Sequence, residues 1–130
     1  MPRRERTTHR YRLAAGFWLA AIFLLTLWPR PPEVLPDLPS LPGADKATHA
    51  LLYGVEGWLI VRGWSGGPGR GGSGVRVLRV LAVIAVVAAV NETLQRFFPP
   101  RTPEWGDYAA DVLGGLLGAW LSVRRENRES

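Results

Sequence analysis

The chain alternates between long apolar stretches and short segments that carry most of its charge. An apolar stretch of about 20 residues is long enough to cross a bilayer as a helix. Four such stretches follow one another, with polar segments between them. This pattern is typical of an all-α integral membrane protein, and it predicts a four-helix bundle. The expected spans are residues 13–28, 46–64, 77–98 and 107–123.

The first stretch, residues 13–28, contains no charged residue. As a helix it rises about 24 Å, slightly less than the ~30 Å hydrocarbon core, and Arg12 can extend toward the headgroups. A cleaved signal peptide is the alternative. No small-residue cleavage pattern accompanies its end at Trp28, so we interpret this stretch as an uncleaved span. Residues 1–12 and 124–130 are then basic tails around one membrane domain, residues 13–123.

The basic residues are unevenly distributed between the two sets of connections. Twelve of the 16 Lys and Arg residues lie in the two tails or around the glycine-rich segment of residues 63–74. Positive charge is retained on the cytoplasmic side of a membrane, so both termini are expected in the cytoplasm. Tryptophans are expected at both interfaces, with Trp28 and Trp105 outside and Trp64 and Trp120 inside.

Charge and cysteine content exclude several classes of partner and site. The formal net charge of +5 is compatible with nucleic-acid binding. The arginines flank apolar stretches, however, and do not form one basic face with stacking aromatics, so no nucleic-acid partner is expected. The absence of cysteine excludes disulfides and thiolate metal sites. The glycine-rich segment lacks the phosphate-loop pattern and is interpreted as a flexible connection.

Polar residues recur at helical spacing within three of the expected spans. Residues spaced three or four apart share a helix face, and ionisable groups inside a membrane usually serve a function or have a partner. The second span carries Asp45, His49, Tyr53 and Glu56 on one face, the third carries Glu92 and Gln95, and the fourth carries Asp107, Asp111, Gly114 and Gly118. The Gly114–Gly118 spacing allows close helix packing. With this topology the outer ends of all three spans converge at one membrane face, and Glu56 lies deeper in the second span. The residues expected at that face are Asp45, Lys46, His49, Glu92, Gln95, Arg101, Asp107 and Asp111.

At these residues the chain resembles the VanZ-like family. The matching elements are Asp45-Lys46-x-x-His49-x-x-x-Tyr53, Glu92-x-x-Gln95, Arg101, and Asp107-x-x-x-Asp111-x-x-Gly114-x-x-x-Gly118. The resemblance covers about residues 29–121. It implies a small integral protein of the bacterial cytoplasmic membrane, in a family whose founding member is associated with resistance to teicoplanin. We do not assign resistance to this chain.

The cluster has a coherent chemistry. Arg101 can bind a phosphate or carboxylate through two parallel hydrogen bonds, and Lys46 adds a point charge. His49 can transfer a proton, and Asp45 or Glu92 can shift the pKa of its imidazole. The acidic residues Glu92, Asp107 and Asp111 can orient His49 or hold a hard divalent cation. The candidate catalytic residues are therefore His49 and Glu92. The candidate ligand-binding residues are Asp45, Lys46, Tyr53, Gln95, Arg101, Asp107 and Asp111.

Structural alternatives exist for each member of the cluster. The pairs Asp45–Lys46, Glu92–Arg96 and Arg101–Asp107 are candidate ion pairs that fasten helix ends. His49 and Tyr53 are compatible with interior packing, and Glu56 with either a proton relay or a bond to another span. A transition-metal site is not expected, because His49 is the one histidine within reach. No cofactor is expected.

Three functions follow from this arrangement. The first is a membrane protein that binds an anionic lipid or a lipid-linked cell-wall precursor at the outer cluster. The second is a small membrane enzyme that acts on such a lipid. The third is a structural protein whose Gly114–Gly118 face meets a membrane-protein partner or a second copy of the chain.

Overall fold

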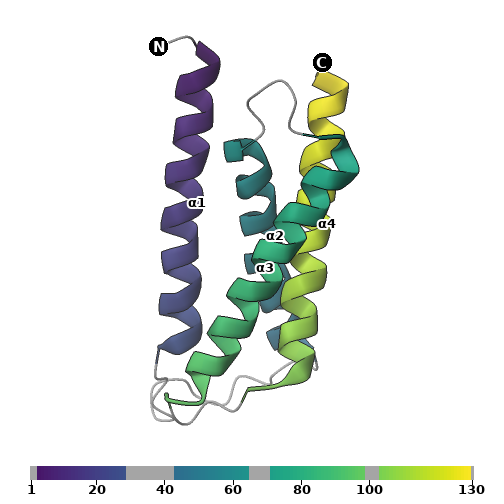
Figure 1. Ribbon diagram of the computed structural model, residues 1–130. Coiled ribbons are helices and arrows are strands. Elements are labelled where there is room, and N and C mark those ends of the chain that lie inside the picture. Colours follow the sequence, from purple (N-terminus) through teal and green to yellow (C-terminus); the bar gives the residue numbers. More distant parts are fainter. Residues whose placement is uncertain (1–2, 29–42, 65–70, 99–102, 130) are drawn as a thin grey trace.

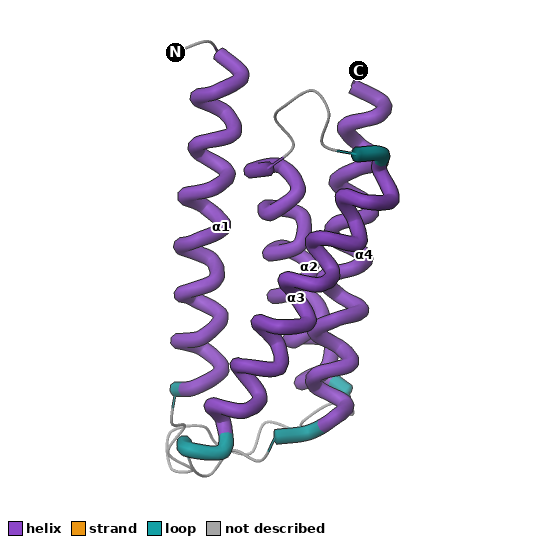
Figure 2. The backbone as a smooth tube through the Cα atoms, viewed as in Figure 1, coloured by secondary structure: helices purple, strands orange, loops and turns teal. Residues whose placement is uncertain are grey.

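The computed structural model describes residues 3–28, 43–64, 71–98 and 103–129, and these residues form four helices. The helices are α1 (Arg3–Leu27), α2 (Ala44–Trp64), α3 (Ser73–Gln95) and α4 (Trp105–Glu129). They run alternately down and up, so that the start of α1 and the end of α4 lie at the same end of the bundle (Figures 1 and 2). The all-α prediction is confirmed, and the described part of the chain contains no strand.

Two helices extend well beyond the expected spans. Helix α1 begins at Arg3, inside the segment expected to be a tail, and α4 continues to Glu129. Arg and Glu are good helix formers, so charged residues next to an apolar helix can continue it without a break. The segment of residues 29–42, between α1 and α2, lies outside the described residues.

Local residue chemistry explains where the helices begin and end. Gly43 precedes α2 and Gly71 precedes α3, each with φ of 83°, a backbone conformation that side chains disfavour. Helix α3 ends in a tighter turn, because the N–H of Phe97 donates to the carbonyl of Leu94, only three residues earlier, at 3.0 Å. Two prolines follow in the sequence at 99 and 100, and a proline cannot continue the hydrogen-bond ladder.

Helices α2 and α4 form the closest pair in the bundle because glycines face each other across it. A Cβ added to Gly118 would overlap the carbonyl oxygen of Gly54, and one added to Gly114 would overlap that of Ala50. A Cβ at Gly57 would overlap the carbonyl oxygen of Gly115 in the same way. The small-residue face of α4 is therefore covered by α2 of the same chain, which brings the polar residues of both helices together.

Helix α1 packs on α2 and α3, and its backbone makes no contact with that of α4 among the described residues. The indole Nε1 of Trp18 donates to the carbonyl of Leu52 on α2 at 2.8 Å. The hydroxyl of Thr26 lies 2.9 Å from Oδ1 of Asn91 on α3. The central core is apolar and consists of Ile22, Tyr53, Val61, Val80, Ile84, Ala88, Ala119 and Val123.

Two of the four helices, over Glu5–Leu27 and Ser73–Gln95, are long and apolar enough to cross a membrane. In each, 17% of the apolar window is buried inside the bundle. Helices α2 and α4 do not meet this criterion, because polar side chains such as Glu56 and Asp111 interrupt their apolar residues. By length and composition the structure thus provides two candidate spans, where the sequence pattern predicted four.

Candidate functional site

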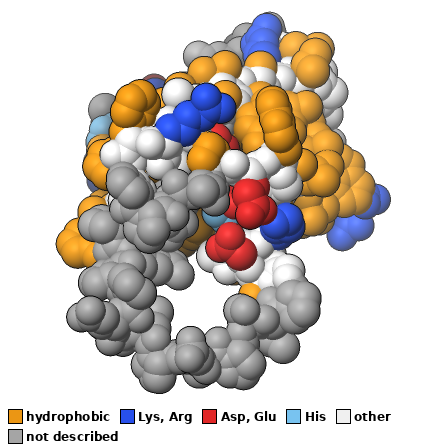
Figure 3. All heavy atoms as spheres, turned by 90° about the horizontal axis from the view of Figure 1, so that it is seen from below, with side chains coloured by type: hydrophobic (Ala, Val, Ile, Leu, Met, Phe, Trp, Pro, Cys, Tyr) orange, Lys and Arg blue, Asp and Glu red, His pale blue; other side chains and the backbone are white. Residues whose placement is uncertain are grey.

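Most of the polar residues singled out in the sequence gather at the end of the bundle opposite the chain termini, whereas Tyr53 and Glu56 lie deeper between the helices. This end is formed by the first turns of α2 and α4 and the last turn of α3 (Figure 1). Figure 3 views the bundle from this end, and acidic side chains gather there beside a histidine and a basic side chain, with hydrophobic side chains around them. The up-and-down path of the chain explains why three segments distant in sequence meet here.

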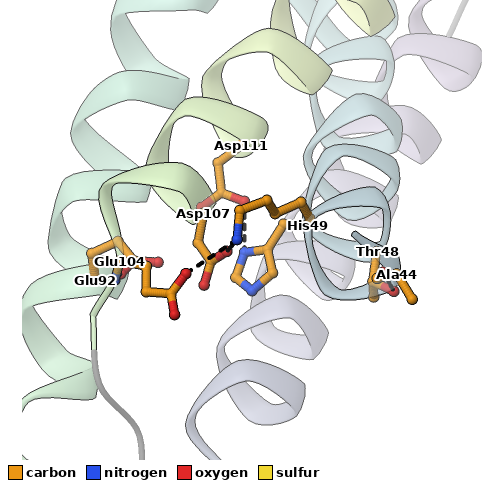
Figure 4. Close-up of polar contacts among 8 residues, drawn as sticks. Ala44, Thr48, His49, Glu92, Glu104, Asp107 and Asp111 are labelled. Atoms are coloured by element: carbon orange, nitrogen blue, oxygen red, sulfur yellow. Dashed lines mark hydrogen bonds and ion pairs between the residues drawn. The ribbon is translucent and has the colours of Figure 1, made fainter. Parts of the chain in front are cut away.

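The centre of the site is a buried contact between His49 on α2 and Asp111 on α4. Nδ1 of His49 lies 2.9 Å from Oδ1 of Asp111, and the two side chains are 3% and 0% exposed. The two residues point toward each other in Figure 4. The carboxylate of Glu92, from α3, approaches this pair, and one ligand atom from each of the three residues lies within 4.8 Å of the others. The site thus joins one imidazole and two buried carboxylates from three helices.

Lys46 lies at the outer edge of the site. Its Nζ is 3.1 Å from Oε2 of Glu104 and 3.5 Å from Oδ1 of Asp107. The side chain of Lys46 is 48% exposed, whereas that of Asp107 is 7% exposed. Lys46 therefore provides a cation for Asp107 and Glu104 at the solvent side of the site.

Three buried carboxylate oxygens in the site have no hydrogen-bond partner among the described residues. Oδ1 of Asp107 still has its ion pair with Lys46, whereas Oε1 of Glu92 and Oδ2 of Asp111 have no charged partner. The other oxygen of Glu92 accepts a long hydrogen bond, 3.3 Å, from the backbone N–H of Glu104. Buried polar atoms are almost always paired in folded proteins, so unpaired carboxylate oxygens indicate a missing ligand, water or proton.

The remaining predicted site residues lie in different surroundings. Asp45 is exposed in the first turn of α2, and it belongs with His49 and Asp107 to a second close group. Gln95 is buried at the end of α3, and its Nε2 has no partner among the described residues. Tyr53 is fully buried in the apolar core. Arg101 lies outside the described residues.

The ion pairs of this end differ from those considered in the sequence. Within the described chain, Lys46 pairs with Glu104 and Asp107, and neither Asp45–Lys46 nor Glu92–Arg96 forms an ion pair. Sequence reasoning gave no role to Glu104. Its place just before the first turn of α4 was the available signal, because an acidic residue is favoured at a helix N-terminus.

The helices line two hollows. One, of about 300 Å³, lies beside the cluster and is lined by residues that include Glu92, Arg96, Glu104 and Trp105. The other, of about 650 Å³, lies between α1, α2 and α3 nearer the chain termini. It is mainly apolar, with Glu56 and three arginines among its lining residues. The first hollow is therefore the one that a ligand of the cluster would occupy.

Comparison with family models, with curated proteins and with solved structures gives no match to this chain.

Proposed function

We propose that the protein is a VanZ-like membrane protein that binds the anionic headgroup of a lipid, or of a lipid-linked cell-wall precursor, at the end formed by α2, α3 and α4. The observation that carries the proposal is the group of His49, Glu92 and Asp111, buried at a helix end with two unpaired carboxylate oxygens. The residues on which the family resemblance rests supply all three side chains.

The outer surface of the bundle supports a position in the membrane. The apolar helices α1 and α3 are not core helices, since most of their apolar windows are unburied. Side chains such as Phe17 on α1, 78% exposed, and Leu78 on α3, 65% exposed, point away from the bundle. Exposed apolar surface on this scale is typical of a membrane-facing protein. Helix α4 contributes Leu113, Leu117 and Leu121 to the exposed apolar surface.

Helices α2 and α4 fit a four-span arrangement because their polar faces turn inward. His49 and Glu56 on α2 and Asp107 and Asp111 on α4 are all buried. Polar residues inside membrane bundles face other helices in this way. Four spans would place both termini on one side, and the arginine distribution favours the cytoplasmic side. The family resemblance is what favours a bacterial inner membrane.

The tryptophans at the arginine-rich end agree with this orientation. The guanidinium of Arg12 lies over the ring of Trp64 at 5.5 Å, and that of Arg124 lies over Trp120 at 4.4 Å. Aromatic rings and arginines are enriched together where a helix leaves the hydrocarbon region.

Cationic groups near the cluster provide the contact for an anionic headgroup. Lys46 is half exposed at the mouth, and the exposed Arg96 lines the adjoining hollow beside Glu92. Trp105, 88% exposed, lies on the same hollow and suits the headgroup region of a membrane. Arg101, in the connection between α3 and α4, is the third cation that the sequence assigns to this end.

The test is native mass spectrometry of the mildly solubilised protein. We expect wild-type protein to retain a defined anionic lipid, and Lys46→Gln and Arg96→Gln to lose most of it. The matched control is Arg128→Gln, because Arg128 is exposed at the opposite end of α4. Retention of the same lipids by all four proteins would rule out a headgroup site at this end.

A second candidate function is catalysis, and the His49–Asp111 contact favours it. A carboxylate on Nδ1 orients an imidazole so that Nε2 is available as a base, as in catalytic triads. Glu92 is the second acid–base group within reach. If the protein is an enzyme, His49→Gln abolishes turnover of the retained lipid, and native mass spectrometry of the same variant measures how much lipid is still bound. If turnover is absent in wild type, the binding function stands alone.

A further inference from the structure

The cluster at the α2–α3–α4 end combines buried carboxylates, an imidazole and unpaired oxygen atoms. We propose that His49, Glu92 and Asp111 bind one hard divalent cation, Mg²⁺ or Mn²⁺, which contacts the phosphate of the bound headgroup. The phosphate contact rests on the proposed function, whereas the cation site stands on its own geometry.

The spacing of the three side chains fits an octahedral ion. Bonds of about 2.1 Å place adjacent ligands about 3.0 Å apart and opposite ligands about 4.2 Å apart. Nδ1 of His49 and Oδ1 of Asp111 are 2.9 Å apart, the separation of adjacent ligands, and a bound cation would replace the proton that these two atoms share without it. All three ligand atoms lie within 4.8 Å of one another, near the ~4.2 Å that separates opposite ligands of such an ion.

The charges of the site also favour a cation. Within the described residues, no Lys or Arg forms an ion pair with Glu92 or Asp111. Lys46 is engaged by Glu104 and Asp107, and that contact lies at the exposed edge. Two buried carboxylates without a cation are strongly unfavourable, and one divalent ion balances both.

The unpaired oxygens are a separate indication of a ligand. Glu92 is 8% exposed and Asp111 is 0% exposed, yet each has one oxygen without a partner among the described residues. Glu92 lies within ligand distance of His49 and Asp111, so its carboxylate is directed into the same group. A cation bound to Oε1 of Glu92 would satisfy that oxygen, and a water on the cation would donate to Oδ2 of Asp111.

The donor set indicates which metals fit. Carboxylates suit Mg²⁺ and Mn²⁺, and the chain has no thiolate that would favour a softer metal. Three protein ligands leave about three positions of an octahedron for water or phosphate oxygens. The alternative group of Asp45, His49 and Asp107 is less suitable, because Asp45 is exposed and Asp107 already contacts Lys46.

A cation resolves a conflict in the charge of the proposed headgroup site. A phosphate that approached Glu92 and Asp111 directly would be repelled by both carboxylates. A divalent ion between them converts this repulsion into attraction, since Mg²⁺ commonly binds one or two carboxylates together with substrate phosphates. The hollow beside Glu92 provides the space for that phosphate.

The experiment uses Mn²⁺ as the probe, with the full chain in phosphatidylglycerol nanodiscs after chelator treatment. Electron paramagnetic resonance should detect one bound Mn²⁺ per chain, and its spin-echo modulation should show a ¹⁴N coupling from His49. Glu92→Gln and Asp111→Asn should each weaken Mn²⁺ binding by more than roughly tenfold, the loss typical of even an outer-shell change. Glu56→Gln is the matched control, because Glu56 is a buried carboxyl residue on α2 outside the group.

The possible results separate the cation site from the proposed function. A ³¹P coupling to Mn²⁺ in nanodiscs that inorganic phosphate in detergent does not reproduce would support the lipid contact. Nitrogen coupling with no ³¹P coupling from either source would leave the cation site and overturn the phosphate contact. Lipid retention that is unchanged by chelator, with no stoichiometric Mn²⁺, would overturn the cation site and leave the proposed function. The nitrogen coupling is measured on wild-type protein, so the test does not depend on how well the variants fold.

Discussion

His49 and Asp111 are separated by 62 residues in the chain, yet Nδ1 of one lies 2.9 Å from Oδ1 of the other, and both side chains are buried. The contact links α2 to α4 at the end where both helices begin. Removing one partner leaves the other buried and unsatisfied, which costs more than removing both.

A double-mutant cycle should therefore show strong coupling between these two residues. We expect His49→Ala and Asp111→Ala each to lower the free energy of unfolding, and the double variant to lose less than their sum. Residues in contact typically couple by about 0.5–3 kcal/mol. Denaturation should be followed in detergent with chelator present, so that a cation does not contribute. Additive losses would show that the contact is not formed in the folded protein.

Gly118 provides a test of the α2–α4 packing. Gly118→Ala should destabilise the bundle by about 1–3 kcal/mol, because its Cβ would overlap the carbonyl oxygen of Gly54. Gly16→Ala is the control, since a Cβ there meets no atom within 4 Å. That change should be neutral or stabilising by about 0.5–1 kcal/mol, as expected for Gly to Ala inside a helix. Equal melting temperatures for the two variants would contradict the close approach of α2 and α4.

Substitutions of Thr26 and Thr93 can be compared to test the contact between α1 and α3. Each hydroxyl donates to the carbonyl four residues earlier, that of Ile22 at 2.8 Å and that of Ala89 at 2.7 Å. Thr26 is buried and also lies beside Asn91, whereas Thr93 is exposed. Thr26→Val should cost about 1 kcal/mol more than Thr93→Val, because it removes a partner from buried Asn91. Chemical denaturation of both variants measures the difference, and equal losses would exclude the interhelical bond.

The hydrogen bonds of Glu129, a residue outside the expected spans, predict that stability depends weakly on pH. Hydrogen bonds from Arg62 and Arg125 lower the pKa of this carboxyl below its usual value. A lowered pKa in the folded state means that the contribution to stability is present above the unfolded value and is lost as pH falls through the folded value. NMR titration of the Glu129 carboxylate should show its pKa rising toward the ordinary value in Arg62→Gln. An unchanged titration would mean that Arg62 does not pair with it.

The sequence by itself determined the helices and their polar faces. Apolar blocks with polar residues at spacings of three and four predicted four helices, and the alternating path placed the polar residues of α2, α3 and α4 at one end. The Gly114–Gly118 pattern predicted a close helix contact. These features follow from periodicity, which is local and can be read along the chain.

Only the tertiary structure decided which side chains meet. Periodicity gives a face for each helix but does not give the rotation and height at which two faces pack. The structure therefore supplied the pairing of His49 with Asp111 and of Lys46 with Glu104. It also showed that α2 of the same chain covers the glycine face of α4. Contacts between residues so distant in sequence depend on the packing of the whole bundle, and no short pattern in the chain encodes them.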